Sequence, residues 1–153
     1  MTDPISFDTT TPRHGLPMLF AGQAQREVFV NEALARVDGL LHLAVEGISA
    51  APPTTPADGQ AWLVGPSPSG VWADKAGTIA FRQSGQWLFQ TPRDGMHALD
   101  RSTGQIIHFA ANAWHAPSAP AAPSGGTVVD VEARAAIVNL LQSLQDAGLF
   151  PTP

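Results

Sequence analysis

The stretch that decides the fold begins with Asp58-Gly59-Gln60-Ala61-Trp62-Leu63-Val64 and ends with Asn112-Ala113-Trp114. Within it, a glycine repeatedly precedes a short run of aromatic or β-branched residues. The units that follow the first are Gly70-Val71-Trp72, Gly77-Thr78-Ile79-Ala80-Phe81, Gly85-Gln86-Trp87-Leu88-Phe89, Gly95-Met96-His97-Ala98-Leu99 and Gly104-Gln105-Ile106-Ile107-His108-Phe109. Glycines spaced 7 to 11 residues apart are typical of β-hairpins, because glycine adopts positive φ at low cost. We therefore predict a small antiparallel β-domain of about five to six strands, with turns at Ser84-Gly85, Asp94-Gly95 and Thr103-Gly104.

A helix is predicted before this domain, from Gly22 to about Val37. Its apolar residues recur near helical spacing and are expected to face the core; they are Ala24, Val28, Ala33, Leu34 and Val37. Gly39 suits a C-terminal cap, and a short strand is expected soon after Leu41.

A second helix is predicted near the C-terminus, with Asp130 as its N-cap and Gly148 as its stop. Ala133, Ile137, Leu140, Leu144 and Ala147 follow a 4-3-4-3 spacing, with Val138 and Leu141 beside them. This apolar face must be buried either against copies of itself or against the chain's own β-domain. Self-association is favoured, with the following oligomerisation residues: Ile137, Leu140, Leu141 and Leu144.

The expected fold class is α+β, arranged as an N-terminal arm and helix, the β-domain, a linker and a C-terminal helix. The predicted ranges are 1–20 for an extended docking arm, 21–115 for the helix plus antiparallel β-domain, 116–128 for a Pro/Gly linker, and 129–150 for the oligomerisation helix. The arm is either a floppy terminus or a segment that docks on a partner. Its large apolar side chains favour docking. The candidate docking residues are Ile5, Phe7, Leu16, Leu19 and Phe20.

Composition excludes several partners and classes of protein. Eight basic residues stand against 13 acidic ones in 153 residues, so no basic stripe is present for nucleic acid. No apolar run approaches the ~20 residues that span a bilayer, and the first residues do not resemble a signal peptide. We therefore expect no nucleic-acid or membrane partner.

The residues that carry chemistry show no catalytic or metal-binding pattern. The chain has no cysteine, and none of its five histidines forms an i, i+4 pair, although His97 and His108 can lie near each other on neighbouring strands. A nucleophile motif and a phosphate-binding glycine loop are absent. A polysaccharide hydrolase would need two convergent carboxylates, whereas Asp58, Asp74, Asp94 and Asp100 lie beside turns. We expect no enzyme activity, no metal and no cofactor.

The four tryptophans all lie in the β-region. In Gln86-Trp87-Leu88-Phe89-Gln90 both strand faces are apolar, which indicates either a packed core or a face buried between subunits. A carbohydrate-binding platform is the alternative, because sugars stack on indole rings. Trp72 and Trp114 are predicted to be the exposed pair, and hence the candidate glycan-binding residues of a module that recognises a host cell-surface polysaccharide.

Several short motifs resemble a domain of uncharacterised function found in tailed phages and gene transfer agents. The resemblance covers about residues 14–115 and rests on Leu16-Pro17, Ala21-Gly22-Gln23-Ala24-Gln25, Asn31-Glu32-Ala33-Leu34, Asp38, Pro52-Pro53, Pro56-Ala57-Asp58-Gly59, Thr91-Pro92-Arg93 and Gly95. The C-terminal helix is similar to the closing element of many phage fibre proteins.

This resemblance implies a structural virion component, namely the base or adaptor of a head spike or fibre involved in host attachment. The favoured role is the head-spike base of a gene transfer agent, made in the bacterial cytoplasm and released by lysis. Its implied partners are copies of itself as a trimer or pentamer, a capsid or tail protein, and a distal fibre protein. The family offers no catalytic residues to carry over. This chain stops soon after the domain and is expected to lack the long fibre or receptor-binding body of larger relatives, so the resemblance does not imply direct host recognition by this chain.

Overall fold

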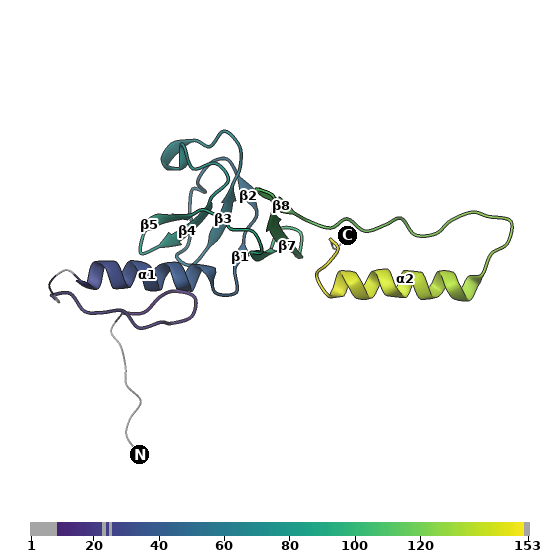
Figure 1. Cartoon of the computed structure of the whole chain (residues 1–153), viewed down its shortest axis with the longest axis horizontal. Helices are drawn as coiled ribbons and strands as arrows, with labels where there is room; N and C mark the ends of the chain where they lie inside the picture. Colours follow the sequence, from purple (N-terminus) through teal and green to yellow (C-terminus); the bar gives the residue numbers. More distant parts are fainter. Residues whose placement is uncertain (1–8, 23, 25, 152–153) are drawn as a thin grey trace, which may run out of the picture. The chain divides into compact units, whose positions relative to one another are not determined.

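The computed structural model describes residues 9–22, 24 and 26–151, and it confirms the α+β class with a helix on either side of the strands (Figure 1). Two compact units meet in sequence at Pro92 and Arg93, within the range where one β-domain was expected. The elements in chain order are α1 (Arg26–Leu40), β1 (Ala44–Val45), β2 (Ile48–Ser49), β3 (Ala61–Val64), the 3-10 turn η1 (Gly70–Trp72), β4 (Ile79–Gln83), β5 (Gln86–Gln90), β6 (His97–Asp100), β7 (Gln105–Ala110), β8 (Ala113–His115) and α2 (Val131–Asp146).

Among the described residues, eight strands lie in two small sheets, whereas five to six were expected in the glycine-spaced domain. Of the two strands that lie before that domain, β1 is the short strand expected soon after Leu41, and β2 was not predicted. The strand β2 also pairs in parallel with β3, so this sheet is mixed and not purely antiparallel. Conversely, Gly70-Val71-Trp72 forms the turn η1, although its sequence pattern resembled a strand.

The sheet of the first unit has the strand order β2-β3-β4-β5. The hairpin between β4 and β5 turns at Ser84 and Gly85, whose φ angles of 47° and 73° are both positive. Two consecutive positive φ angles are the signature of a tight turn that matches the twist of the strands. The hairpin predicted at this position is confirmed.

The core of the first unit is built around Trp72, which η1 holds with none of its surface exposed. The Trp72 and Trp87 rings meet edge to face with centroids 5.0 Å apart, and Trp62 lies 6.3 Å from Trp72. The Nε1 atom of Trp72 has no hydrogen-bond acceptor among the described residues. Trp72 is therefore a core residue, and the prediction that it is exposed is wrong.

Helix α1 presents a different face to the core from the one its apolar spacing predicted. Ala35, Asp38 and Gly39 are buried, whereas Val28 and Val37 are exposed. Gly39 lies inside the helix and is not its cap; a Cβ there would come within 2.7 Å of the Phe81 ring. Close packing of the helix backbone on an aromatic ring therefore selects the buried face.

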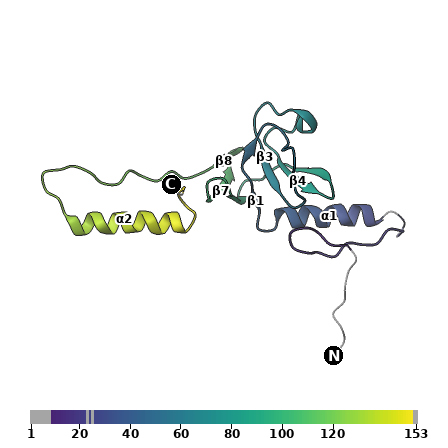
Figure 2. The same cartoon turned by 180° about the vertical axis from the view of Figure 1, so that it is seen from behind.

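The described part of the arm, residues 9–22, folds back along α1 and is not fully extended (Figures 1 and 2). Thr10 and Pro17 form an antiparallel bridge, so the arm makes a small loop of its own. The side chain of Asn31 on α1 bonds both the amide and the carbonyl of Leu19, at 2.8 and 3.0 Å. The arm is thus held by side chains of the helix.

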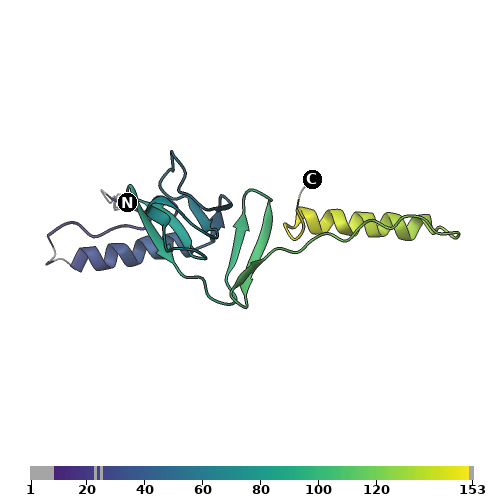
Figure 3. The same cartoon turned by 90° about the horizontal axis from the view of Figure 1, so that it is seen from above.

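The second unit contains the antiparallel strands β6, β7 and β8, followed by the linker and α2 (Figure 3). The expected turn glycines Gly95 and Gly104 have φ angles of 90° and 71°. The Asp130 carboxylate accepts a hydrogen bond from the Ala133 amide at 2.8 Å, and Gly148 follows the helix with φ 73°. The cap and stop predicted for α2 are confirmed.

Candidate functional site

The first candidate surface is the apolar face of α2. No residue of α2 is buried, counting contacts with every residue that the structure describes. Ile137 and Leu140 are 43% and 59% exposed, while Leu141 and Leu144 are half-buried. The predicted oligomerisation residues therefore form an accessible stripe on one side of the helix.

The segment that follows the C-terminal end of α2 is bonded to a strand of its unit. The Ile106 amide donates a hydrogen bond of 2.7 Å to the Gly148 carbonyl, and Gln105 Nε2 donates to the Leu149 carbonyl at 3.3 Å. Gly148 packs tightly here, because a Cβ would lie 3.3 Å from the carbonyl oxygen of Gly104. Intramolecular docking thus fixes the end of the helix and leaves its apolar stripe uncovered in this unit.

A second candidate surface, missed in the sequence, is the outer face of α1. Phe29 is 77% exposed and Val37 is 51% exposed, and Val30 and Leu41 are exposed beside them. The seven-residue step from Val30 to Val37, with Ala33 between, was the available signal, since it matches the spacing of a helix-pairing seam. Of these residues, Val37 had been expected to face the core, and no role had been predicted for the exposed Phe29 and Val30.

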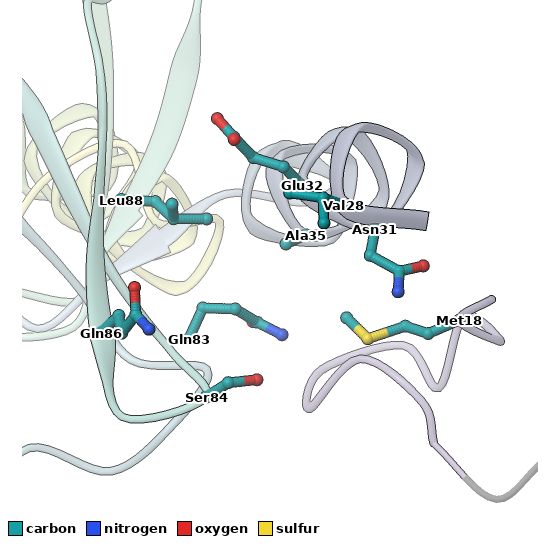
Figure 4. Close-up of a pocket in the computed structure, with 9 residues that line it drawn as sticks. All are labelled: Met18, Val28, Asn31, Glu32, Ala35, Gln83, Ser84, Gln86 and Leu88. Atoms are coloured by element: carbon teal, nitrogen blue, oxygen red, sulfur yellow. The ribbon is translucent and has the colours of Figure 1, made fainter. Parts of the chain in front are cut away.

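The arm contributes two shallow pockets between itself, α1 and the β4–β5 turn. They have volumes of about 320 and 550 Å³, and both are lined by Met18, Asn31 and Ser84. Figure 4 shows the smaller of the two. Among the predicted docking residues, Leu16 and Leu19 are half-buried, and Phe20 is exposed at the edge of the larger pocket. Ile5 and Phe7 lie outside the described residues.

Asp38 holds the arm in place at the C-terminal end of α1. Its carboxylate accepts hydrogen bonds from the Thr11 hydroxyl at 2.7 Å and from the amides of His14 and Arg13 at 2.8 and 3.1 Å. Burial by itself would raise the pKa of Asp38, but the bonds from Thr11, His14 and Arg13 outweigh burial, so the pKa lies below its ordinary value. The buried Asp38 carboxylate therefore fixes the arm to the C-terminal end of α1.

The candidate glycan-binding pair is not arranged as predicted. Trp72 is fully buried, so the expectation that it is exposed is wrong, and it offers no ring face to a sugar. The reason is that η1 turns its side chain inward onto Val64 and Ala80. Trp114 is half-buried, and its ring meets Phe109 edge to face at 5.3 Å.

Three histidines form a row on the exposed face of β6, β7 and β8. His97 is paired with His108, and His108 with His115, across adjacent strands. The expected proximity of His97 and His108 is confirmed, with ring centroids 6.2 Å apart. In their present orientations, no three His, Asp or Glu side chains of the described residues are arranged to hold a metal ion.

The two helices are too short or too polar to cross a bilayer, within the part of the chain that the structure describes. A search of the curated proteins found no match to the chain. A family model described as "protein of unknown function (DUF2793)" matches residues 30–115. That range contains most of α1 and every strand, and it leaves out the described arm and α2. Because the match spans more than half of the 153 residues, the chain belongs to the DUF2793 family.

Proposed function

We propose that this protein is a structural component of a phage-like particle, the base or adaptor subunit of a head spike or fibre. In this role it works as a homo-oligomer that anchors a distal fibre to the capsid of a gene transfer agent. The resemblance of its motifs to phage and gene-transfer-agent domains supports the particle. The observation that carries the role is the uncovered apolar stripe of α2.

Burial of that stripe supplies a driving force for assembly. Each Ile or Leu moved from water into a packed interface contributes about 1.5–3 kcal/mol, so Ile137, Leu140 and Leu144 are sufficient to hold helices together. A helix of 16 residues is marginal by itself in water. The strands of the second unit anchor the end of α2 and so reduce the entropy lost on assembly.

The remaining surfaces divide the work among partners. The arm, with Leu19 and Phe20 and the pockets beside them, is assigned to the capsid or tail protein. The α2 stripe is assigned to the copies of the subunit and to the distal fibre. Both assignments place apolar side chains against partners. The same side chains exposed as a patch on a monomer would promote aggregation.

The test of the α2 interface is a pair of charge substitutions. Leu140→Asp with Leu144→Asp is expected to convert the oligomer into a monomer in sedimentation velocity, because two carboxylates cannot be desolvated at the seam. The matched control, Asn139→Asp with Gln142→Glu, adds the same charge to the opposite side of α2 and is expected to keep the oligomer. A wild-type chain that sediments as a monomer at high concentration contradicts the proposal.

The test of the role itself is made in particles. Cryo-electron microscopy compares particles from the source organism that contain this chain with particles that lack it. The particles that lack it are expected to show no density at the spike or fibre base. Intact spikes in particles that lack the chain would refute the assignment.

A further inference from the structure

The histidine row on the second unit has a geometry that the proposed function does not use. His97, His108 and His115 come from three consecutive strands, and all three are exposed. The rings of His108 and His115 have centroids 5.3 Å apart and planes inclined by only 26°. Three cross-strand imidazoles in register are a concentrated set of nitrogen ligands on an otherwise uncharged face.

Two of these rings have their hydrogen-bonding roles set by the backbone. His97 Nδ1 lies 3.1 Å from the Gly95 carbonyl, and His115 Nε2 lies 3.0 Å from the Ala110 carbonyl. A carbonyl only accepts, so each of these nitrogens carries the proton and the other nitrogen of the ring has a free lone pair. The same arrangement, with the second ring nitrogen bonded to a carbonyl, is typical of histidines that ligate metals.

His108 and His115 lie directly opposite each other on adjacent strands, with ring centroids 5.3 Å apart, so one ion can reach both rings once their nitrogens converge. On a tetrahedral zinc the two ring nitrogens would each lie about 2.0–2.1 Å from the metal. The rings now lie face to face, so binding needs rotation of the His108 side chain, which exposed residues make in picoseconds to nanoseconds.

We propose that this face binds a divalent transition-metal ion, with His108 and His115 as the chelating pair and water in the remaining positions. Imidazole nitrogen is a preferred ligand of zinc, nickel and copper ions. The proposal does not require a third convergent side chain, and it is independent of the spike or fibre role.

The experiment is calorimetric titration of the full-length, tag-free chain with Zn²⁺. The wild type is expected to bind one Zn²⁺ per chain, and His108→Gln and His115→Gln are each expected to weaken binding at least tenfold. His42→Gln is the matched control, since His42 belongs to another histidine pair, with its ring 6.2 Å from that of His14. It is expected to bind as the wild type does.

A second measurement on the wild type avoids dependence on the variants. In a proton–carbon NMR spectrum, Zn²⁺ is expected to shift the ring signals of His108 and His115 and to leave those of His14 and His42 in place. Absence of stoichiometric binding, wild-type affinity in both Gln variants, or a loss of binding in His42→Gln would overturn the proposal.

Discussion

At the scale of single residues, Asp38 connects the arm to the helix. Its carboxylate is 1% exposed and is surrounded by donors from Thr11, Arg13 and His14. Arg13 in turn donates to the carbonyls of Gly39 and His42 at 2.7 Å each, and so caps the end of α1. One buried carboxylate thus fixes both the start of the described chain and the end of its first helix.

The lowered pKa of Asp38 predicts how stability depends on pH. The unfolded chain takes up the proton at a higher pH than the folded one, so the contribution of Asp38 is complete above its ordinary pKa of about 3.9. That contribution is lost as the pH falls toward the lower folded value. Asp38→Asn is expected to cost about 2–3 kcal/mol at pH 7, because hydrogen bonds to a charged acceptor are lost.

Urea denaturation of the wild type and of Asp38→Asn between pH 7 and pH 3 measures this effect. The difference in the free energy of unfolding between the wild type and Asp38→Asn is expected to shrink as the pH falls below about 4. Glu32→Gln is the control, since the Glu32 carboxylate is exposed and its pair with Arg36 at 2.7 Å contributes little. A constant difference across the whole pH range would show that the charge of Asp38 is not what stabilises the fold.

At the scale of elements, α2 depends on local interactions more than any other element does. None of its residues is buried among the described residues, so its first turn is stabilised by the Asp130 cap and by Glu132 near the positive end of the helix dipole. Such a helix frays in a dilute monomer and becomes regular when its stripe is covered.

Removal of the cap is therefore expected to have a measurable effect on helix content. Asp130→Ala should cost about 1 kcal/mol of helix stability and reduce the far-UV circular dichroism signal at 222 nm at low protein concentration. Thr127→Ala, just before the cap, is the control and should leave the signal unchanged. The loss of helix signal in Asp130→Ala should become smaller as the protein concentration rises. Equal helix content in Asp130→Ala and Thr127→Ala under dilute conditions would contradict this account.

At the scale of the whole molecule, apolar surface lies on two helices that belong to different compact units. Neither surface is needed to stabilise the unit that carries it, because the cores lie elsewhere. Such surface has a cost in solubility for a monomer, and the contacts that we propose with further copies and partners would cover it. The low content of charged residues, 14% of the chain, fits the same explanation.

The outer face of α1 provides a prediction at this scale. Phe29→Ser with Val37→Ser is expected to change the free energy of unfolding of the dilute chain, measured in urea, by no more than about 0.5 kcal/mol. The reason is that exposed side chains contribute little to folding. The same variant should weaken association in sedimentation equilibrium. Val28→Ser, on the pocket side of α1, is the matched control and should associate like the wild type. Unaltered association of the double variant would remove this face from the assembly.

Local chemistry explains which parts of this structure were predictable from sequence. The turn glycines, the Asp130 cap and the Gly148 stop each depend on a few neighbouring residues, so their φ angles and hydrogen bonds follow from residue type. The two-residue strand β2 carries no such signal and forms by pairing with β3, which is distant in the sequence.

What the sequence by itself determined is the α+β class, the hairpin turns and the extent and apolar stripe of α2. What only the tertiary structure decided is which side of α1 is buried, where Trp72 lies, and that His115 stands beside His108 in the row that His97 begins. The physical reason is that these depend on contacts between residues far apart in the chain. Phe81 needs the bare backbone of Gly39, and strand register aligns His97, His108 and His115, and neither condition is expressed in local spacing.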